Sequence, residues 1–127
     1  MQILWKLPLP SSGCTNGPDL GEEPGRTHTL TFECENYEGS ICNSELRFFD
    51  VKAFRCWYLH ALTADMIETS YDQLVDLGDT AWLRETREQA ATYAEGDNLR
   101  HLRICFDDGP CYEFACVDFR ISTQAKL

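Results

Sequence analysis

The chain has 127 residues, enough for one domain with a substantial hydrophobic core. Hydrophobic residues make up 43% of the chain and aromatic residues 12%, which is typical of a globular protein and excludes a disordered one. The 11 basic and 21 acidic residues leave a formal net charge of -10, which disfavours nucleic acid and anionic membranes and favours a basic protein as partner.

The N-terminal segment alternates apolar residues with others, which predicts a strand with one buried face formed by Ile3, Trp5, Leu7 and Leu9. Lys6 and two prolines interrupt its apolar run, which is too short for a secretion signal. No other segment has the length of a membrane span. We therefore expect a cytoplasmic protein without a membrane partner.

Residues 11–26 (SSGCTNGPDLGEEPGR) contain four glycines and two prolines, a composition that predicts a long surface loop. Three strands are predicted after it, at 27–37, 42–49 and 52–62. The first of these has the clearest alternation, which places one set of side chains toward the core: His28, Leu30, Phe32 and Cys34.

Two helices are predicted next. Thr63 is the expected N-cap of the first, whose apolar positions recur at helical spacing as far as Val75, and Gly78 is expected to end it. Asp79 or Thr80 is the expected N-cap of the second, which continues through good helix formers and is expected to end within AEGDN at 94–98.

Two further strands are predicted from Arg100 onward. Strands grouped before and after a helical insert indicate an α+β fold. We expect a mainly antiparallel sheet of about six strands, with a sandwich as one arrangement and two helices inserted between the strand groups. Residues 1–127 are expected to form a single domain.

The segment RHLRICFDDGPCYEFAC, residues 100–116, gathers the residue types that carry chemistry. Its Asp-Gly pair predicts a hairpin turn. Five of the polar residues in this segment are the candidate binding residues: His101, Arg103, Asp107, Asp108 and Glu113.

Two registers are open for this hairpin. A two-residue turn would place Glu113 opposite Ile104, on the apolar face, at a cost of several kcal/mol. A three-residue turn at 108–110 would place Phe106 opposite Tyr112 and keep one face apolar, so we favour it. His101 and Arg103 would then share the other face with Glu113, close enough for an exposed ion pair.

The chain has seven cysteines, an odd number, and no Cys-x-x-Cys motif. We therefore expect free thiols in a reducing compartment. No metal-binding spacing, phosphate-binding glycine loop or nucleophile elbow occurs in the sequence. We therefore assign no catalytic residue, metal ligand or cofactor. The alternative is a small hydrolase or metal-dependent enzyme that uses the acidic residues and the histidine of the hairpin.

Two stretches, YDQLVDLGDTAWL (71–83) and LRHLRICFDDGPCYE (99–113), resemble a group of small, uncharacterised bacterial proteins. The shared pattern is Tyr-Asp-x-Leu-Val, Trp-Leu, Arg-His, Phe-Asp-Asp and Cys-Tyr-Glu. The resemblance covers roughly the last two thirds of the chain and implies a bacterial single domain of unknown function, with no catalytic residue to carry over.

In size and acidity the chain is also similar to immunity proteins that neutralise secreted toxins. Together with the charge, this likeness predicts a non-enzymatic interaction or binding module for a basic partner. The oligomeric state stays open, and a homodimer is among the options.

Overall fold

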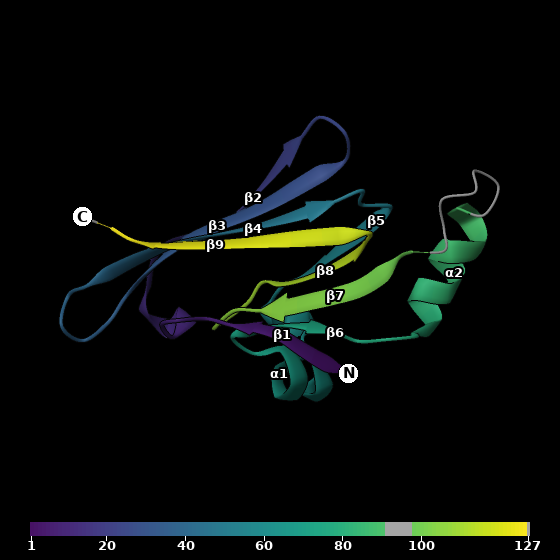
Figure 1. The fold of residues 1–127 in the computed structure, drawn as a ribbon. Coiled ribbons are helices and arrows are strands. Elements are labelled where there is room, and N and C mark those ends of the chain that lie inside the picture. Colours follow the sequence, from purple (N-terminus) through teal and green to yellow (C-terminus); the bar gives the residue numbers. More distant parts are fainter. Residues whose placement is uncertain (91–97, 127) are drawn as a thin grey trace.

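A computed structural model describes residues 1–90 and 98–126, which form two antiparallel β-sheets stacked face to face (Figure 1). In these two ranges, no helix has the length and apolar character needed to cross a bilayer. The predicted end of the second helix at 94–98 falls almost entirely outside the described residues.

The larger sheet has five strands in the order β1-β6-β7-β8-β5. Their bounds are β1 Gln2–Lys6, β6 Gln73–Asp76, β7 Arg100–Cys105, β8 Cys111–Cys116 and β5 Ala53–Trp57. The smaller sheet has four strands in the order β2-β3-β4-β9. Their bounds are β2 Cys14–Glu23, β3 Thr27–Glu35, β4 Ile41–Phe49 and β9 Asp118–Ala125.

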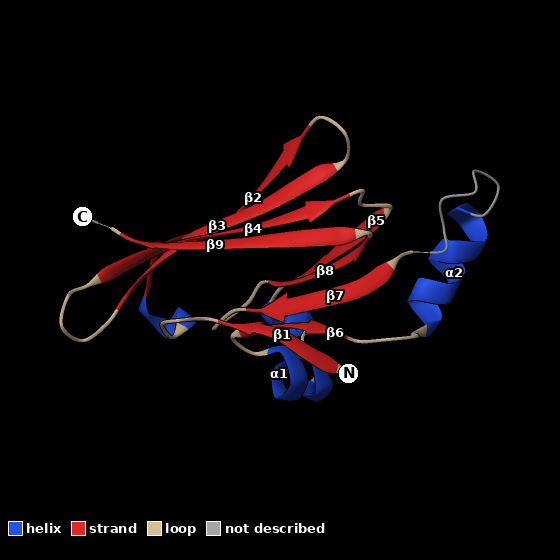
Figure 2. Cartoon of the chain, viewed as in Figure 1, coloured by secondary structure: helices blue, strands red, loops and turns tan. Residues whose placement is uncertain are grey.

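Both α-helices, α1 (Ala64–Ser70) and α2 (Ala81–Ala90), lie beside the five-stranded sheet and away from the smaller one (Figure 2). Two short 3-10 turns, η1 (Ser11–Gly13) and η2 (Leu59–Ala61), complete the described elements. The outer face of the four-stranded sheet is therefore covered by neither helix.

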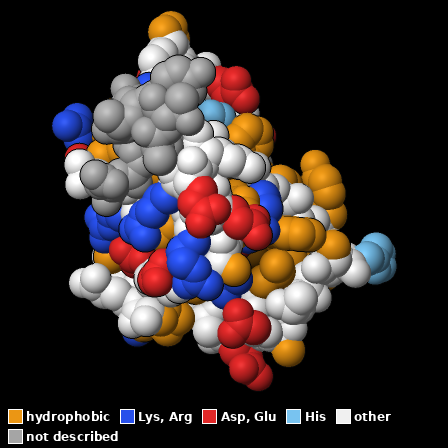
Figure 3. Space-filling model, turned by 90° about the vertical axis from the view of Figure 1, so that its right-hand side faces the viewer, with side chains coloured by type: hydrophobic (Ala, Val, Ile, Leu, Met, Phe, Trp, Pro, Cys, Tyr) orange, Lys and Arg blue, Asp and Glu red, His pale blue; other side chains and the backbone are white. Residues whose placement is uncertain are grey.

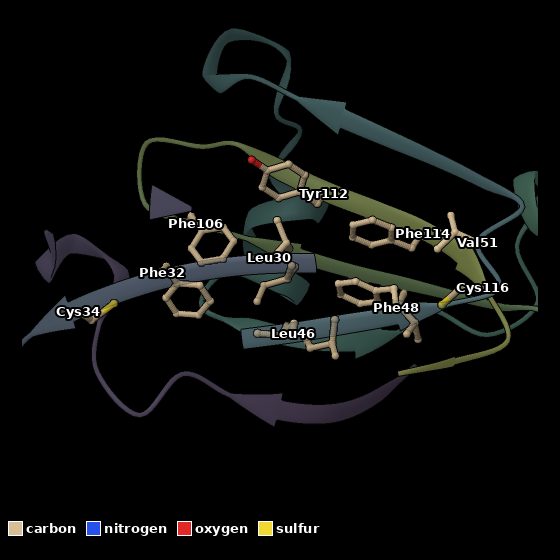
Figure 4. Packing of buried hydrophobic residues seen from close by; sticks show 13 residues of the cluster. Leu30, Phe32, Cys34, Leu46, Phe48, Val51, Phe106, Tyr112, Phe114 and Cys116 are labelled. Carbon is tan, nitrogen blue, oxygen red and sulfur yellow. The ribbon is translucent and has the colours of Figure 1, made fainter. Parts of the chain in front are cut away.

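Aromatic side chains from both sheets meet in the core (Figure 4). The rings of Phe48 on β4 and Phe114 on β8 stack with centroids 4.0 Å apart, and Phe32 on β3 meets Phe106 edge-on at 5.0 Å. Full burial of one such side chain stabilises the fold by roughly 1.5–3 kcal/mol. Inward-facing apolar residues of both sheets thus hold the two layers together.

The predicted α+β class and the antiparallel pairing are confirmed, but the expected number of strands is too low. Residues 1–90 and 98–126 contain nine strands in two sheets. Two of the additional strands, β2 and β6, lie where a loop and a helix were predicted.

The first predicted helix is correct only as far as Ser70. Thr63 is its N-cap as predicted, since the Met66 N–H donates to Thr63 Oγ1 at 3.3 Å. Leu74 and Val75 lie instead in β6, where both are fully buried. Adjacent apolar residues suit a central strand that is covered on both faces as well as they suit a helix, so the spacing was ambiguous.

The prediction of a surface loop over 11–26 is wrong for Cys14–Glu23, which forms the edge strand β2 and pairs with β3. The pairing is irregular between Cys14 and Asp19, which is where Gly17 and Pro18 lie. Proline has no N–H to donate to a neighbouring strand. An edge strand tolerates it because one side of that strand has no neighbour. A side chain at Gly17 is excluded, because a Cβ there would lie 2.5 Å from the Thr31 carbonyl oxygen.

Candidate functional site

The predicted hairpin exists, but its register differs from the favoured one by two positions. Arg103 pairs with Glu113, and Ile104 pairs with Tyr112. The turn is made by residues 107–109, because the Phe106 N–H donates to the Pro110 carbonyl at 3.2 Å. A shift of two residues leaves every side chain on its face, so the predicted division into two faces is correct although the pairing is wrong.

The outward face of this hairpin carries a buried polar cluster, which we define as Arg55, Trp57, Thr80, His101, Arg103 and Glu113. Glu113 lies at its centre and is only 1% exposed. Its Oε1 accepts a hydrogen bond from His101 Nε2 at 2.8 Å, and its Oε2 accepts one from Trp57 Nε1 at 2.6 Å. The ion pair predicted between Arg103 and Glu113 was expected to be exposed, but both side chains are buried.

Two guanidinium groups complete the surroundings of Glu113. Arg55 Nη2 lies 3.0 Å from Glu113 Oε2, and Arg103 Nη1 lies 3.7 Å from Glu113 Oε1. Burial alone would raise the pKa of this carboxyl group. Hydrogen bonds from His101 and Trp57, with the charge of Arg55, outweigh burial and lower the pKa of Glu113 to about 2. The group is therefore a stable carboxylate at neutral pH.

Arg103 connects this cluster to α1. Its Nε donates to Ser70 Oγ at 2.8 Å, and its Nη2 donates to Thr69 Oγ1 at 2.7 Å and to Asp65 Oδ2 at 3.0 Å. Arg103 is only 5% exposed, and these hydrogen bonds replace the water that its guanidinium would otherwise bind. A buried guanidinium is tolerated when its donors are satisfied in this way.

His101 connects the cluster to α2. Its Nδ1 lies 2.7 Å from Thr80 Oγ1, which also accepts a hydrogen bond from the Leu83 N–H at 3.2 Å. Of the two residues predicted as the cap of this helix, Asp79 and Thr80, it is therefore Thr80 that caps it. In the neutral imidazole, this arrangement places the ring proton on Nε2, where it is donated to Glu113. The edge of the Trp82 ring packs against His101 with centroids 4.7 Å apart.

An open pocket of about 560 Å³ lies over the cluster and is bordered by side chains of α1, α2 and the N-terminal residue. Arg55 forms part of its wall, with its guanidinium 4.1 Å from the Trp82 ring centroid and 5.4 Å from that of Trp57. Thr80, His101 and Glu113 form a hydroxyl–imidazole–carboxylate series beside this pocket. That order of groups is the one that activates a hydroxyl nucleophile in acyl-transfer enzymes.

Of the predicted site residues, the structure brings together His101, Arg103 and Glu113. Asp107 and Asp108 lie in the hairpin turn instead. Asp107 Oδ1 accepts a hydrogen bond from the Tyr71 hydroxyl at 2.8 Å, which raises the pKa of Tyr71 to about 12. Asp108 is exposed and has φ +59°, as a turn residue requires.

The sequence did not reveal Arg55, Trp57 and Thr80 as members of the cluster. Arg55 and Trp57 have the same parity in β5, so their common face could be read from the pattern. Their approach to Glu113 depends on the pairing of β5 with β8, whose residues lie more than fifty positions apart. No local signal specifies such a pairing.

The expectation of free thiols alone is wrong for one pair. Cys105 and Cys111, which face each other across the hairpin, form a disulfide. The five other cysteines are free. Within the described part of the chain, no group of three or more His, Cys, Asp or Glu side chains is placed to hold a metal ion.

A second hollow lies on the outer face of the four-stranded sheet. We call it the acidic depression; its volume is about 360 Å³. Three carboxylate side chains line it, those of Asp19, Glu33 and Glu45, and its other lining residues are uncharged: Asn16, Thr31, Phe32, Asn43, Ser44, Ser122 and Gln124.

Comparison of the chain with protein-family models, with curated proteins and with solved structures found no match.

Proposed function

We propose that the protein is a non-enzymatic binding module whose acidic depression receives a basic segment of a partner protein. The observation that carries this proposal is the depression itself, a hollow with three carboxylates and no cationic side chain in its lining. A lysine or arginine of a partner would find there several oxygen acceptors and a favourable field.

The position of the depression supports the proposal. Neither α1 nor α2 lies over the outer face of the four-stranded sheet, so a partner can approach it along all four strands (Figure 2). The end of the molecule near α2, by contrast, shows basic and acidic side chains next to one another (Figure 3). The lining of the depression differs from that end, because it contains acidic side chains and no basic one, and the two nearby bases pair with its acids from outside the lining.

Two ion pairs already occupy the rim of the depression. Lys126 Nζ lies 2.9 Å from Glu33 Oε1, and Arg47 Nη2 lies 3.3 Å from Glu45 Oε1. Exposed pairs of this kind contribute only about 0–1 kcal/mol. A partner's cation can therefore replace either one at little cost. With the net charge of -10, the same field would accelerate association.

An immunity-like role is a special case of this proposal, in which the basic partner is a toxin. It draws on the small size and acidity of the chain. A toxin gene adjacent to the gene for this protein would support that special case, and the general proposal does not depend on it.

Selection from a displayed library of random peptides, followed by fluorescence anisotropy, tests the proposal. The test variant is the triple substitution Asp19→Asn, Glu33→Gln and Glu45→Gln. The control variant, Glu68→Gln, Glu85→Gln and Glu88→Gln, changes the net charge equally on exposed helix positions.

We expect the selected peptides to be rich in Lys and Arg and to bind the test variant about tenfold or more weakly, while the control variant loses only a small part of the affinity. Peptides without basic residues, or equal losses in the two variants, would show that the depression is not the binding surface.

A hydrolase is the second candidate, and the Thr80–His101–Glu113 series beside the open pocket favours it. In this mechanism, Thr80 Oγ1 attacks an ester carbonyl while its proton passes to His101 Nδ1; the ester C–O bond breaks, and the departing alcohol takes up that proton. Water then attacks the acyl group on Thr80, which releases the acid and restores the hydroxyl. Hydrolysis of p-nitrophenyl acetate by the purified protein tests this. Activity that is retained in Thr80→Ser and lost in Thr80→Val would support it, and equal background rates in all three proteins would exclude it.

A further inference from the structure

Three cysteines lie side by side across three neighbouring strands at one end of the four-stranded sheet. Cys14 on β2 pairs with Cys34 on β3, and Cys34 pairs with Cys42 on β4. Residues directly opposite in an antiparallel pair point to the same face of the sheet. Because Cys34 points into the core, all three thiols belong to the inner face.

The sulfurs of Cys14 and Cys34 are in direct contact, 2.7 Å apart. Cys14 is partly exposed, and Cys34 is buried with 3% of its surface exposed. A reagent from solution therefore reaches Cys14 first, and Cys34 is already in position to react with whatever Cys14 carries.

We propose that Cys14 and Cys34 form a second disulfide, which ties the edge strand β2 to β3, by exchange with a small-molecule disulfide such as glutathione disulfide. Neither residue belongs to the acidic depression or to the buried polar cluster, so the proposal stands apart from the proposed function.

The exchange proceeds in two balanced steps. Cys14 loses its proton to solvent, and its thiolate attacks one sulfur of the small disulfide; that S–S bond breaks, and the departing thiolate takes up a proton. Cys34 then loses its proton and attacks the Cys14 sulfur of the mixed disulfide, which releases the second small thiol. Two protein thiols are oxidised, and one small disulfide is reduced to two thiols.

The environment of Cys14 sets the pace of this reaction. Burial raises the pKa of the Cys14 thiol, and its hydrogen bond with Cys34 offsets only part of that effect. Because the thiolate is the attacking species, the exchange is slow at neutral pH and accelerates as the pH rises. This behaviour is typical of a structural disulfide that forms once, and not of a fast redox sensor.

Cys42 is the competing thiol, because it is the neighbour of Cys34 on the other side. Among the free cysteines of the described residues, however, the pair in sulfur–sulfur contact is Cys14 and Cys34. The geometry therefore selects the β2–β3 link over the β3–β4 link.

The position of the link gives it a measurable consequence. Pairing of β2 with β3 is irregular between Cys14 and Asp19, so the first part of this edge strand is held by few ladder bonds. A disulfide at Cys14 fixes the end of that irregular part and closes a chain loop in the unfolded state. We expect the melting temperature to rise by about 5–10 °C on oxidation.

The test is incubation of the native protein with glutathione disulfide at pH 8.5, then blocking of residual thiols, digestion with trypsin and mass spectrometry. Cleavage after Arg26 separates the peptide with Cys14 (7–26) from the peptide with Cys34 and Cys42 (27–47). The wild-type protein and the Cys42→Ser variant should both yield the cross-linked pair of peptides with the loss of two hydrogens. Cys14→Ser should yield no cross-link and no rise in melting temperature.

Two results would overturn the proposal. One is a disulfide inside peptide 27–47 as the main product, which would mean that Cys34 pairs with Cys42. The other is an uncross-linked Cys42→Ser protein that carries glutathione on Cys14 alone. Cys14→Ser alters a partly exposed position, so the comparison does not depend on a variant of the buried Cys34.

Discussion

The carboxylate of Glu113 and the imidazole of His101 lie 2.8 Å apart, and each of the two residues is at most 2% exposed. Through His101 and Thr80 this contact reaches the first turn of α2, and through Arg103 the same carboxylate is linked to α1. Glu113 is thus the one carboxylate in the described residues around which both helices are fastened to the five-stranded sheet.

Glu113→Gln should lower the free energy of unfolding by about 3–5 kcal/mol, because it leaves two guanidinium groups without their buried counter-charge. Urea unfolding followed by circular dichroism measures this loss. Glu85→Gln on the exposed side of α2 is the control and should change stability by less than about 0.5 kcal/mol. Similar small changes in both variants would mean that Glu113 is not the centre of the cluster.

Acid should destabilise the protein through the same carboxyl group. Its pKa is about 2 in the folded state and 4.5 as the reference value, so folding favours the charged form. This contribution is fully present above about pH 5 and is lost as the pH falls through the folded-state pKa; it amounts to roughly 3 kcal/mol. Unfolding free energies measured between pH 2 and pH 7 should therefore converge for wild type and Glu113→Gln at the acid end. A constant difference across that range would contradict the lowered pKa.

Ser11→Ala should destabilise the protein by about 1–3 kcal/mol, because the Asp107 N–H loses its acceptor and the Asp72 carboxylate keeps only the hydrogen bond from the Ser11 N–H. Ser11 Oγ accepts a hydrogen bond from the Asp107 N–H at 2.7 Å and donates one to Asp72. Ser12→Ala, at the adjacent exposed position, is the matched control. Equal unfolding midpoints for the two variants would show that the contact between η1 and the hairpin turn adds no stability.

Gly17→Ala should destabilise more than Gly25→Ala. Both glycines have positive φ, +89° and +83°, so each substitution carries a backbone strain of about 1–2 kcal/mol. Only the Cβ at position 17 would collide with a backbone oxygen, that of Thr31, whereas nothing lies within 4 Å of the Cβ at position 25. The melting temperatures of the two variants separate the backbone strain, which both share, from the collision, which only Gly17→Ala has. A larger decrease of the melting temperature in Gly25→Ala would refute the close packing of β2 on β3.

Local signals in the sequence predicted local features well. Thr63 is the predicted cap of α1, and Thr80 is one of the two residues predicted as the cap of α2; each hydroxyl accepts a hydrogen bond from the N–H three residues further on. The alternation from His28 to Cys34 placed the core face of β3 correctly, since Leu30, Phe32 and Cys34 are all in the main core. Such features depend on neighbouring residues and so can be read from them.

Features that depend on distant residues could not be predicted. The contact of Trp57 with Glu113 requires β5 to pair with β8 across an intervening helix pair and two strands. Leu74 and Val75 point to opposite faces of β6, and both are buried only because other segments of the chain pack on both faces. Even the hairpin register was ambiguous, because a shift by two residues preserves both faces. The sequence therefore indicated which side chains share a face, and not what lies opposite them.

The proposed binding of a basic segment to the acidic depression is tested most directly by NMR. A peptide of ten residues rich in Lys and Arg is added to the ¹⁵N-labelled protein at physiological salt, and amide shifts are followed. We expect saturable shifts at Asp19, Thr31, Glu33, Asn43 and Glu45, and unchanged shifts at Thr80, Trp82 and the other described residues of α1 and α2. Shifts centred on Thr80 and Trp82, or the absence of saturable shifts on β2, β3 and β4, would contradict it.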